Sequence, residues 1–331
     1  MKQPQIILHI GTPKTGTTSL QCFLHENQTK LNESKLSYPM IDPFAAKKPE
    51  DHSGNAGVIA RNLLPDDDQF FYAEAGCKTF YDLLHNHLSS HSGYTTILSS
   101  EFFWIPEEAK LKKFSLFLSQ FTQNVKVFAY LRRQDSFFES SYQQAVKHGL
   151  THKTYRQFID HSLKNPSNDY LFVLEKYRKV FGKEKIMLRR FDKRFLFHND
   201  IRNDFLQMLG IDHPTGFSFT SDRNVSLPPH YIKAIRLLNR EHKHLRPALL
   251  NFYRKVKPPH RQQGFRFPSQ LKREIIDFYQ ESNRKLGFEY LAERDSLFNE
   301  EIPETQDEDV DNMTDTDLLA LLVDILPILN A

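Results

Sequence analysis

The stretch QIILHIGTPKTGTTSL, close to the N-terminus, constrains the fold of this chain more than any other. Its apolar run over residues 6–10 is typical of a buried strand, which Gly11 ends. A short loop follows, and the residues after Gly16 lead into a helical apolar pattern at Leu20 and Phe23. A strand, a glycine loop and a helix start in this order predict an anion site, because loop and first-turn N–H groups point at one spot.

The position of the lysine distinguishes between kinds of anion site. A nucleotide-triphosphate loop reads G-x-x-x-x-G-K-[ST], with the lysine directly after the second glycine. Here Gly11 and Gly16 have that separation, but Thr17 follows the second glycine and the lysine is Lys14, inside the loop. The pattern therefore differs from a triphosphate loop at its lysine. The alternative to an anion site is an ordinary turn with a solvated lysine.

The segment HIGTPKTGTTSLQ resembles the 5′-phosphosulfate loop of sulfotransferases. These enzymes use 3′-phosphoadenosine 5′-phosphosulfate (PAPS) as sulfuryl donor and release 3′-phosphoadenosine 5′-phosphate (PAP). The resemblance implies that the donor's 5′-phosphate and sulfate are held by six residues of the loop and helix start: Lys14, Thr15, Gly16, Thr17, Thr18 and Ser19.

A second strand, turn and helix are predicted after residue 124, and Arg132 closes that strand. A triphosphate hydrolase would carry an aspartate there to hold magnesium. Sulfotransferases pair an arginine at such a position with a serine eight residues later, so the resemblance implies that Arg132 and Ser140 bind the donor's 3′-phosphate. A guanidinium offers a planar fork of donors to a phosphate. Gln134 stands where the family commonly has a proline.

Two residues are candidates for the general base. Glu101 follows a predicted strand over residues 95–98, and ligands of open α/β sheets bind at the carboxyl ends of the strands. The alternative for Glu101 is a cap of the following helix. His52 precedes a helix predicted from Ser53 through Leu64, and it is either a surface histidine or the base.

The order of elements predicts a three-layer α/β/α fold with a mainly parallel, P-loop-like central sheet and additional C-terminal helices. The resemblance covers roughly residues 5–290. We expect a sulfotransferase domain over residues 1–295, with a donor-binding core over 1–220 and a helical C-terminal part over 221–295. In the family a loop of that part covers the donor, which implies a donor contact for Arg223. Helical patterns are predicted over residues 74–88, 106–121, 154–163, 169–181, 230–240 and 268–286, and after a cap at Asn199.

The charges are distributed unevenly along the chain. All 44 Lys and Arg residues lie within residues 1–294, against 30 acids there, although the net charge of the 331 residues is only +3. A basic body suits an anionic cofactor or substrate, but is as often a solvated surface. We expect an acidic linker and a C-terminal helix over residues 296–331. The apolar stripe of that helix, beginning at Leu318, either docks on the body or pairs two copies into a homodimer.

The number of cysteines and the hydropathy of the chain indicate where in the cell the protein is expected. Cys22 and Cys77 provide neither a disulfide framework nor a zinc-ligand spacing. No apolar run approaches the ~18 residues of a membrane span, and no leader pattern precedes the first strand. We therefore expect a cytoplasmic protein without a membrane span.

The resemblance implies a PAPS-dependent sulfotransferase that works by in-line sulfuryl transfer. Lys14 would stabilise the leaving group, while Glu101 or His52 deprotonates an acceptor hydroxyl. Carbohydrate is the expected acceptor, with lipid or a small phenol as alternatives. The partners are then PAPS or PAP and the acceptor, without a metal and without nucleic acid. A nucleotide-dependent kinase and a non-catalytic nucleotide-binding protein are the alternative functions.

Overall fold

The structure is a computed structural model that describes residues 5–42, 54–219, 227–256, 264–291, 297–298, 301–302, 314 and 317–321. His52 and Arg223 therefore lie outside the described residues, as does most of the acidic segment. The chain forms two compact units. Unit 1 comprises Met1–Arg132, Pro166–Asp222 and Glu281–Phe298, and unit 2 comprises Arg133–Asn165, Arg223–Gln280 and Asn299–Ala331.

Unit 1 contains a five-stranded parallel sheet within the described ranges, in the order β2-β3-β1-β4-β5. Apolar runs such as residues 6–8 form these strands because a parallel sheet is covered on both faces. The central strand β1 has β3 on one side and β4 on the other, so the loop after β1 lies between two strand ends. The strands are β1 (Gln5–His9), β2 (Leu36–Ser37), β3 (Thr95–Ser99), β4 (Val125–Leu131) and β5 (Ile186–Arg190).

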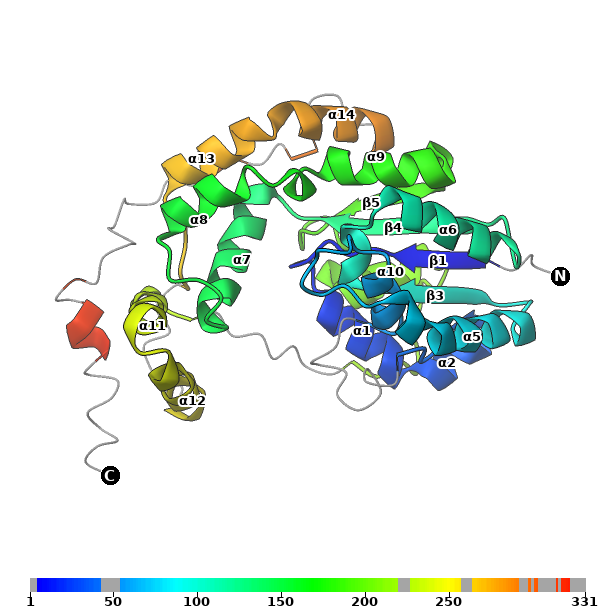
Figure 1. The fold of residues 1–331 in the computed structure, drawn as a ribbon, viewed down its shortest axis with the longest axis horizontal. Helices are drawn as coiled ribbons and strands as arrows, with labels where there is room; N and C mark the ends of the chain where they lie inside the picture. The colour runs from blue at the N-terminus through cyan, green and yellow to red at the C-terminus, as the bar shows by residue number, and fades with distance from the viewer. Residues whose placement is uncertain are drawn as a thin grey trace. The chain divides into compact units, whose positions relative to one another are not determined.

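Helices cover both faces of this sheet, which gives three layers (Figure 1). Along β1 the side chains alternate, so Ile6 and Leu8 pack in one core with α6 and α9, while Ile7 packs in the other with α1 and α10. The helices are α1 (Thr17–Glu26), α2 (Gln28–Glu33), α4 (Gly57–Asn62), α5 (Glu74–Ser90), α6 (Glu108–Ser119), α9 (Tyr170–Phe181), α10 (Ile201–Met208) and α14 (Gln280–Tyr290). Short 3₁₀ turns are η2 (Glu101–Trp104), η3 (Pro166–Asn168), η4 (Lys183–Lys185) and η5 (Phe197–Asn199).

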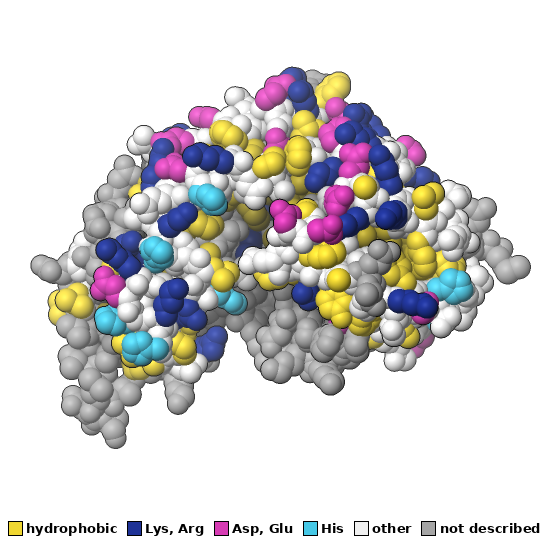
Figure 2. All heavy atoms as spheres, in the orientation of Figure 1, with side chains coloured by type: hydrophobic (Ala, Val, Ile, Leu, Met, Phe, Trp, Pro, Cys, Tyr) yellow, Lys and Arg dark blue, Asp and Glu magenta, His cyan; other side chains and the backbone are white. Residues whose placement is uncertain are grey.

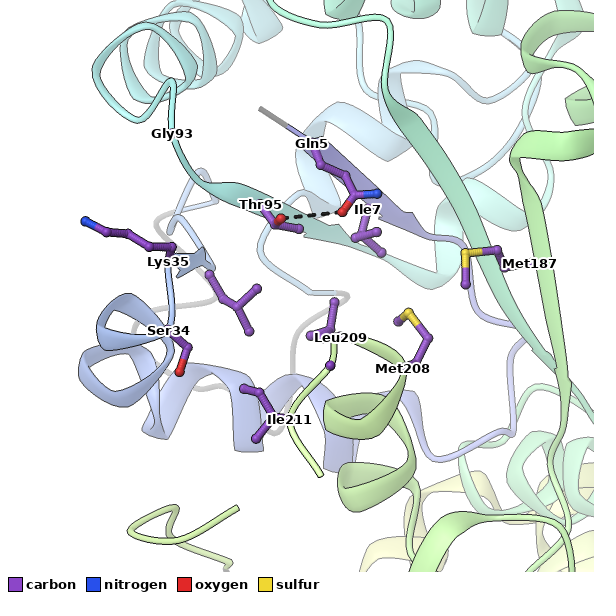
Figure 3. A pocket seen from close by; sticks show the side chains of 12 residues that line it. Gln5, Ile7, Ser34, Lys35, Gly93, Thr95, Met187, Met208, Leu209 and Ile211 are labelled. Atoms are coloured by element: carbon purple, nitrogen blue, oxygen red, sulfur yellow. Dashed lines mark hydrogen bonds between the residues drawn. The ribbon is translucent and has the colours of Figure 1, made fainter. Parts of the chain in front are cut away.

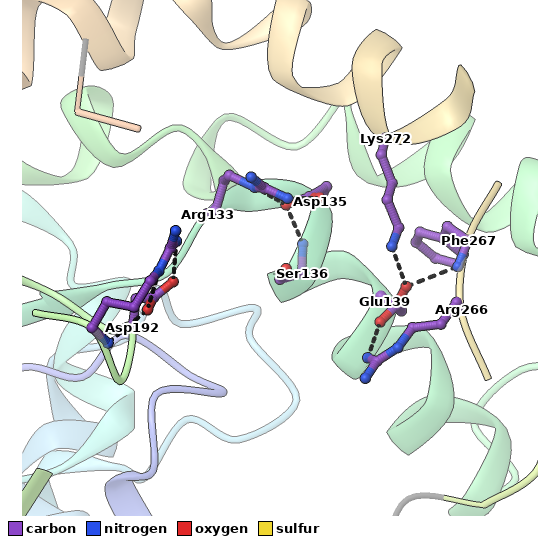
Figure 4. A network of polar contacts seen from close by, with 9 residues as sticks. Arg133, Asp135, Ser136, Glu139, Asp192, Arg266, Phe267 and Lys272 are labelled. Carbon is purple, nitrogen blue, oxygen red and sulfur yellow. Dashed lines mark hydrogen bonds and ion pairs between the residues drawn. The ribbon is translucent and has the colours of Figure 1, made fainter. Parts of the chain in front are cut away.

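Unit 2 is helical in its described part and has its own aromatic core, to which Tyr142 and Tyr231 belong. A buried carboxylate fixes its first helix: Glu139 accepts hydrogen bonds from Arg266 Nη1 at 2.7 Å and from the Phe267 N–H at 2.8 Å, and it pairs with Lys272 Nζ at 3.2 Å (Figure 4). The elements are α7 (Gln134–Lys147), α8 (Tyr155–Ser162), α11 (Pro229–Glu241), η6 (Lys243–Leu245), α12 (Arg246–Val256) and α13 (Ser269–Phe278).

The expected α/β/α fold with a parallel sheet is confirmed. The expected domain boundaries stay a prediction. The single helix expected over residues 268–286 is wrong, because the chain leaves helical geometry at Tyr279 (φ −98°, ψ 6°). The two resulting helices bury their apolar sides in different cores, with Ile275 in unit 2 and Leu286 in unit 1.

Two helix starts differ from the sequence expectations. Asp200, and not Asn199, caps α10, because its carboxylate accepts from the Arg202 N–H at 2.8 Å, while Asn199 has a left-handed φ of 57°. The helix expected from Ser53 begins at Gly57 in the described chain, with Ala56 as its N-cap. In the part of the chain that the structure describes, no helix is long and apolar enough to cross a membrane.

Candidate anion-binding and catalytic site

The loop between β1 and α1 has a backbone that requires glycine at two positions. Gly11 has φ 101° and Gly16 has φ 72°, both in the left-handed region that other residues rarely adopt. A Cβ on Gly16 would also lie 3.3 Å from the Phe191 ring. Lys14 has φ 66°, so the loop turns sharply at the lysine as well.

Hydrogen bonds to β4 hold the first half of this loop. The Thr12 N–H and Thr12 Oγ1 both donate to the Tyr130 carbonyl at 3.1 Å, and the Tyr130 N–H donates to the Gly11 carbonyl at 2.9 Å. The buried Thr15 hydroxyl donates to the Thr12 carbonyl at 2.5 Å. The Thr15 hydroxyl proton therefore stabilises the loop itself, which the sequence pattern did not reveal.

The start of α1 directly follows this loop. Gly16 is its N-cap and, as a glycine, has no side chain that could cap the helix through a hydrogen bond. The first turn, which contains Thr17, Thr18 and Ser19, carries no acid. A helix N-terminus capped by glycine and without an acid in its first turn has a positive dipole end that suits an anionic ligand.

Arg132 brings a second cation to this loop. Its Nη1 donates to the Lys14 carbonyl at 2.9 Å, and its guanidinium lies 5.8 Å from the centre of the Phe191 ring. The Arg132 carbonyl accepts a hydrogen bond from the Tyr170 hydroxyl at 2.5 Å, which fixes the backbone where β4 ends. Ser140 lies on α7 in unit 2, so the pairing of Arg132 with Ser140 stays a prediction.

Glu101 lies on the other side of the loop, directly after β3. Its Cα is 3.8 Å from the position that a Cβ on Gly11 would occupy, and its side chain is half-buried. Burial raises the pKa of the Glu101 carboxyl, while the positive charge of Lys14 acts in the opposite direction. The alternative role as a helix cap belongs to Ser100, whose Oγ accepts from the Phe102 N–H at 3.2 Å.

A buried polar network behind Glu101 was missed by the sequence analysis. Ser99 Oγ lies 2.8 Å from His9 Nδ1 and accepts from Gln21 Nε2 at 3.0 Å, while the Ser99 N–H donates to Asn55 Oδ1 at 2.8 Å. Burial lowers the pKa of His9 to about 3, so its ring is neutral. A histidine inside an apolar strand pattern was the available signal.

The network also anchors the segment that follows His52. The Asn55 amide donates to the carbonyls of Pro39 and Ile97, at 2.8 and 2.9 Å. Gly54 approaches β3 so closely that a Cβ would lie 2.1 Å from the Ser99 carbonyl oxygen. The chain at Gly54 is therefore fixed at the carboxyl end of β3, where Glu101 begins.

A cavity of about 290 Å³ in unit 1 lies at the opposite edge of the sheet (Figure 3). Gln5 and Thr95, the first residues of β1 and β3, line it, and Met187 and Met208 face it from β5 and α10. Because the loop between β1 and α1 follows the carboxyl end of β1, this cavity is not part of the candidate site.

The surface charges of unit 1 are mixed. Over α6 and α9, basic and acidic side chains alternate on the face shown in Figure 2, and Glu108 pairs there with Lys112 at 2.8 Å and with Lys179 at 3.4 Å. Near the end of β5, Arg189 pairs with Asp204 at 2.6 Å. Several basic side chains of unit 1 are thus held in local ion pairs.

The chain is similar to known proteins in sequence and in structure. No protein-family model matches the chain. An uncharacterized protein from Archaeoglobus fulgidus is 30% identical over 218 residues, which cover 62% of this chain and 57% of that relative. The chain thus spans less than two thirds of the relative's length. A crystal structure of a sulfotransferase from Alicyclobacillus acidocaldarius aligns with 72% of this chain and 93% of its own, at 15% identity and a TM-score of 0.37.

Proposed function

We propose that this chain is a PAPS-dependent sulfotransferase that transfers the sulfuryl group to an acceptor hydroxyl. The observation that supports it most is the hydrogen bond from Arg132 to the Lys14 carbonyl, because it joins two separately predicted phosphate ligands. Glu101 begins beside the same loop, at Gly11. A loop of N–H donors with two cations suits phosphate and sulfate oxygens, and an adjacent carboxylate suits proton abstraction.

In the proposed reaction the loop and the start of α1 bind the 5′-phosphate and the sulfate of the donor. Lys14 stabilises the negative charge that develops on the bridging oxygen as the bond from sulfur to the 5′-phosphate breaks. Arg132 and Ser140 bind the 3′-phosphate, with Arg223 as a further donor contact. These cations are side chains, so the proposal requires no metal ion.

Glu101 is the proposed base. The acceptor oxygen attacks sulfur, its proton passes to the Glu101 carboxylate, and PAP leaves. A pKa raised by burial suits this role, because a general base works best when its pKa lies near the working pH. His52 is the alternative base, since Gly54 is held at the carboxyl end of β3 and two residues span about 7 Å at most.

Calorimetry with PAP and with ATP tests the proposal, each with and without magnesium. PAP is expected to bind far more tightly than ATP and independently of magnesium, because Lys14 is inside the loop and Arg132 stands where a metal-binding acid would be needed. Ser140→Ala should weaken PAP binding by about 1–3 kcal/mol and leave adenosine 5′-phosphate unaffected. The neighbouring Ser141→Ala is the matched control. Equal affinity for ATP, or magnesium dependence, would favour the kinase alternative.

A further inference from the structure

Four residues of unit 1 form a surface beside Glu101 that we call the arginine–aromatic surface: Arg61, Phe70, Tyr72 and Phe102. The rings of Phe70 and Phe102 lie 5.3 Å apart at an angle of 49°. The Arg61 guanidinium lies 5.8 Å from the centre of the Tyr72 ring and 5.8 Å from that of Phe102. A guanidinium over two rings is attracted by their negative π-faces.

The charge of Arg61 is available to a ligand. Its Nε donates to the Phe70 carbonyl at 2.7 Å, and this bond fixes the direction of the guanidinium. Among the described residues no carboxylate lies within ion-pair distance of Arg61, in contrast to Lys110 nearby, which pairs with Asp66 at 2.6 Å. The Nη1 and Nη2 groups are therefore free of carboxylate partners in the described chain and can bind a carboxylate in the fork geometry.

The surface is adjacent to the proposed base. Phe102 directly follows Glu101 in η2, and α4, which carries Arg61, packs against η2. The Phe70 side chain is 44% exposed, so the surface opens to solvent. A ligand on the Phe102 ring would therefore contact the residue next to Glu101 in the chain, on unit 1 itself.

We propose that the arginine–aromatic surface is the acceptor subsite and that it binds a sugar ring carrying a carboxylate. The proposal rests on the proposed sulfotransferase function and adds the class of acceptor. The apolar C–H face of the sugar covers the Phe70 and Phe102 rings, and the Arg61 fork binds the carboxylate. A hydroxyl of this sugar or of its neighbour in the glycan then reaches Glu101.

The openness of the surface favours a sugar over a small phenol or a lipid. Sites for small apolar ligands enclose most of the ligand surface. Here the Phe70 ring is almost half exposed, and the exposed Gln69 directly precedes it in the chain. An exposed ring beside polar groups and an arginine suits a ligand that is larger than the site and polar at its edges, as a glycan is.

The test measures binding of two matched glycans to the full chain saturated with PAP. The probes are an unsulfated chondroitin tetrasaccharide and the same tetrasaccharide with its carboxylates reduced to alcohols. Calorimetry should show about tenfold or greater preference for the acidic form, because the Arg61 guanidinium makes charge-assisted hydrogen bonds with a carboxylate and not with an alcohol. Arg61→Gln should remove the preference for the acidic form. Phe70→Ala should weaken the binding of both forms by a similar factor.

Matched controls are available on α6. Lys113→Gln removes an exposed cation and Leu116→Ala an exposed apolar side chain, and both should leave glycan binding unchanged. Every variant must bind PAP like the wild type, which shows that it is folded. Equal wild-type binding of the two glycans, a preference that survives Arg61→Gln, or binding of 4-hydroxybenzoate in place of both glycans overturns the subsite. If PAP itself does not bind, the sulfotransferase proposal and the subsite that rests on it both fail.

Discussion

At Glu101 two physical effects on one carboxyl group oppose each other. Burial favours the protonated form and raises its pKa, while Lys14 favours the carboxylate. The net direction is upward, so a reaction that needs the Glu101 carboxylate gains rate as the pH rises through this pKa. The corresponding acid limb should lie above the ordinary carboxyl pKa of about 4.3.

The first prediction concerns the assignment of the base. Glu101→Gln should keep PAP affinity but lower turnover by roughly 10²–10⁴-fold, the usual contribution of a general base, and should abolish the acid limb of the pH–rate profile. His52→Ala should act mainly on acceptor affinity. Turnover and PAP binding of both variants, measured across pH, provide the check. A mild Glu101→Gln and an inactive His52→Ala, with an ionisation near 6.5, would reverse the roles.

His9 has a structural role that the loop motif at residues 5–20 did not suggest. Its ring is buried and neutral, and Nδ1 lies 2.8 Å from Ser99 Oγ, one residue before Ser100 and two before Glu101. His9 is itself on β1, two residues before Gly11. The His9–Ser99 hydrogen bond therefore connects β1, which leads into the glycine loop, with β3, which leads to Glu101.

At the scale of elements, the segment before α4 is fixed to the end of β3. The Asn55 side chain makes three of its hydrogen bonds: the amide donates to the Pro39 and Ile97 carbonyls, and Oδ1 accepts from the Ser99 N–H. Gly54 provides the close approach. The backbone of Gly54 has φ 94°, which a residue with a Cβ rarely adopts. The position of this segment thus depends on one glycine.

A second prediction follows for this contact. Gly54→Ala places a Cβ 2.1 Å from the Ser99 carbonyl oxygen, so it should lower the free energy of unfolding by about 1–3 kcal/mol through overpacking and strain. Urea denaturation measures the loss. Gly93→Ala is the control, because a Cβ there meets no atom within 4 Å, and it should change stability by less than about 0.5 kcal/mol. A neutral Gly54→Ala would show that the segment can shift away from β3.

At the scale of the whole chain, the acidic C-terminal region contacts the basic body within unit 2. Asp317 pairs with Lys233 at 2.6 Å, and the Lys233 side chain is only 5% exposed. Leu321 packs against the unit 2 core, while Leu318 and Leu319 are 48% and 62% exposed. Docking of residues 317–321 on the body is thus observed, and a homodimer through Leu318 and Leu319 stays a prediction.

A third prediction tests this contact. Asp317→Asn leaves the buried Lys233 ammonium without its carboxylate, which should lower the free energy of unfolding by about 1–3 kcal/mol. Asp67→Asn, which changes an exposed carboxylate of unit 1, is the matched control and should be neutral. Chemical denaturation followed by circular dichroism measures both. Equal stability of the two variants would mean that the C-terminal region does not stabilise the body.

The sequence by itself determined the α/β/α fold and the strand, loop and helix at residues 5–26, because short-range patterns of apolar residues and glycines specify these elements locally. The sequence also indicated Lys14, Arg132 and Glu101 as candidate site residues, because residues at the carboxyl ends of parallel strands lie at one edge of the sheet. The roles of these residues and of Ser140 remain predictions.

Only the tertiary structure decided which groups meet. The contact of Arg132 with the Lys14 carbonyl joins residues 118 positions apart, and the His9–Ser99 pair joins residues 90 apart. The break at Tyr279 was likewise invisible, because the apolar pattern continues although its two halves pack in different cores. Periodicity reports which face of an element is buried, but not the partner against which it packs, because the partner comes from a distant part of the chain.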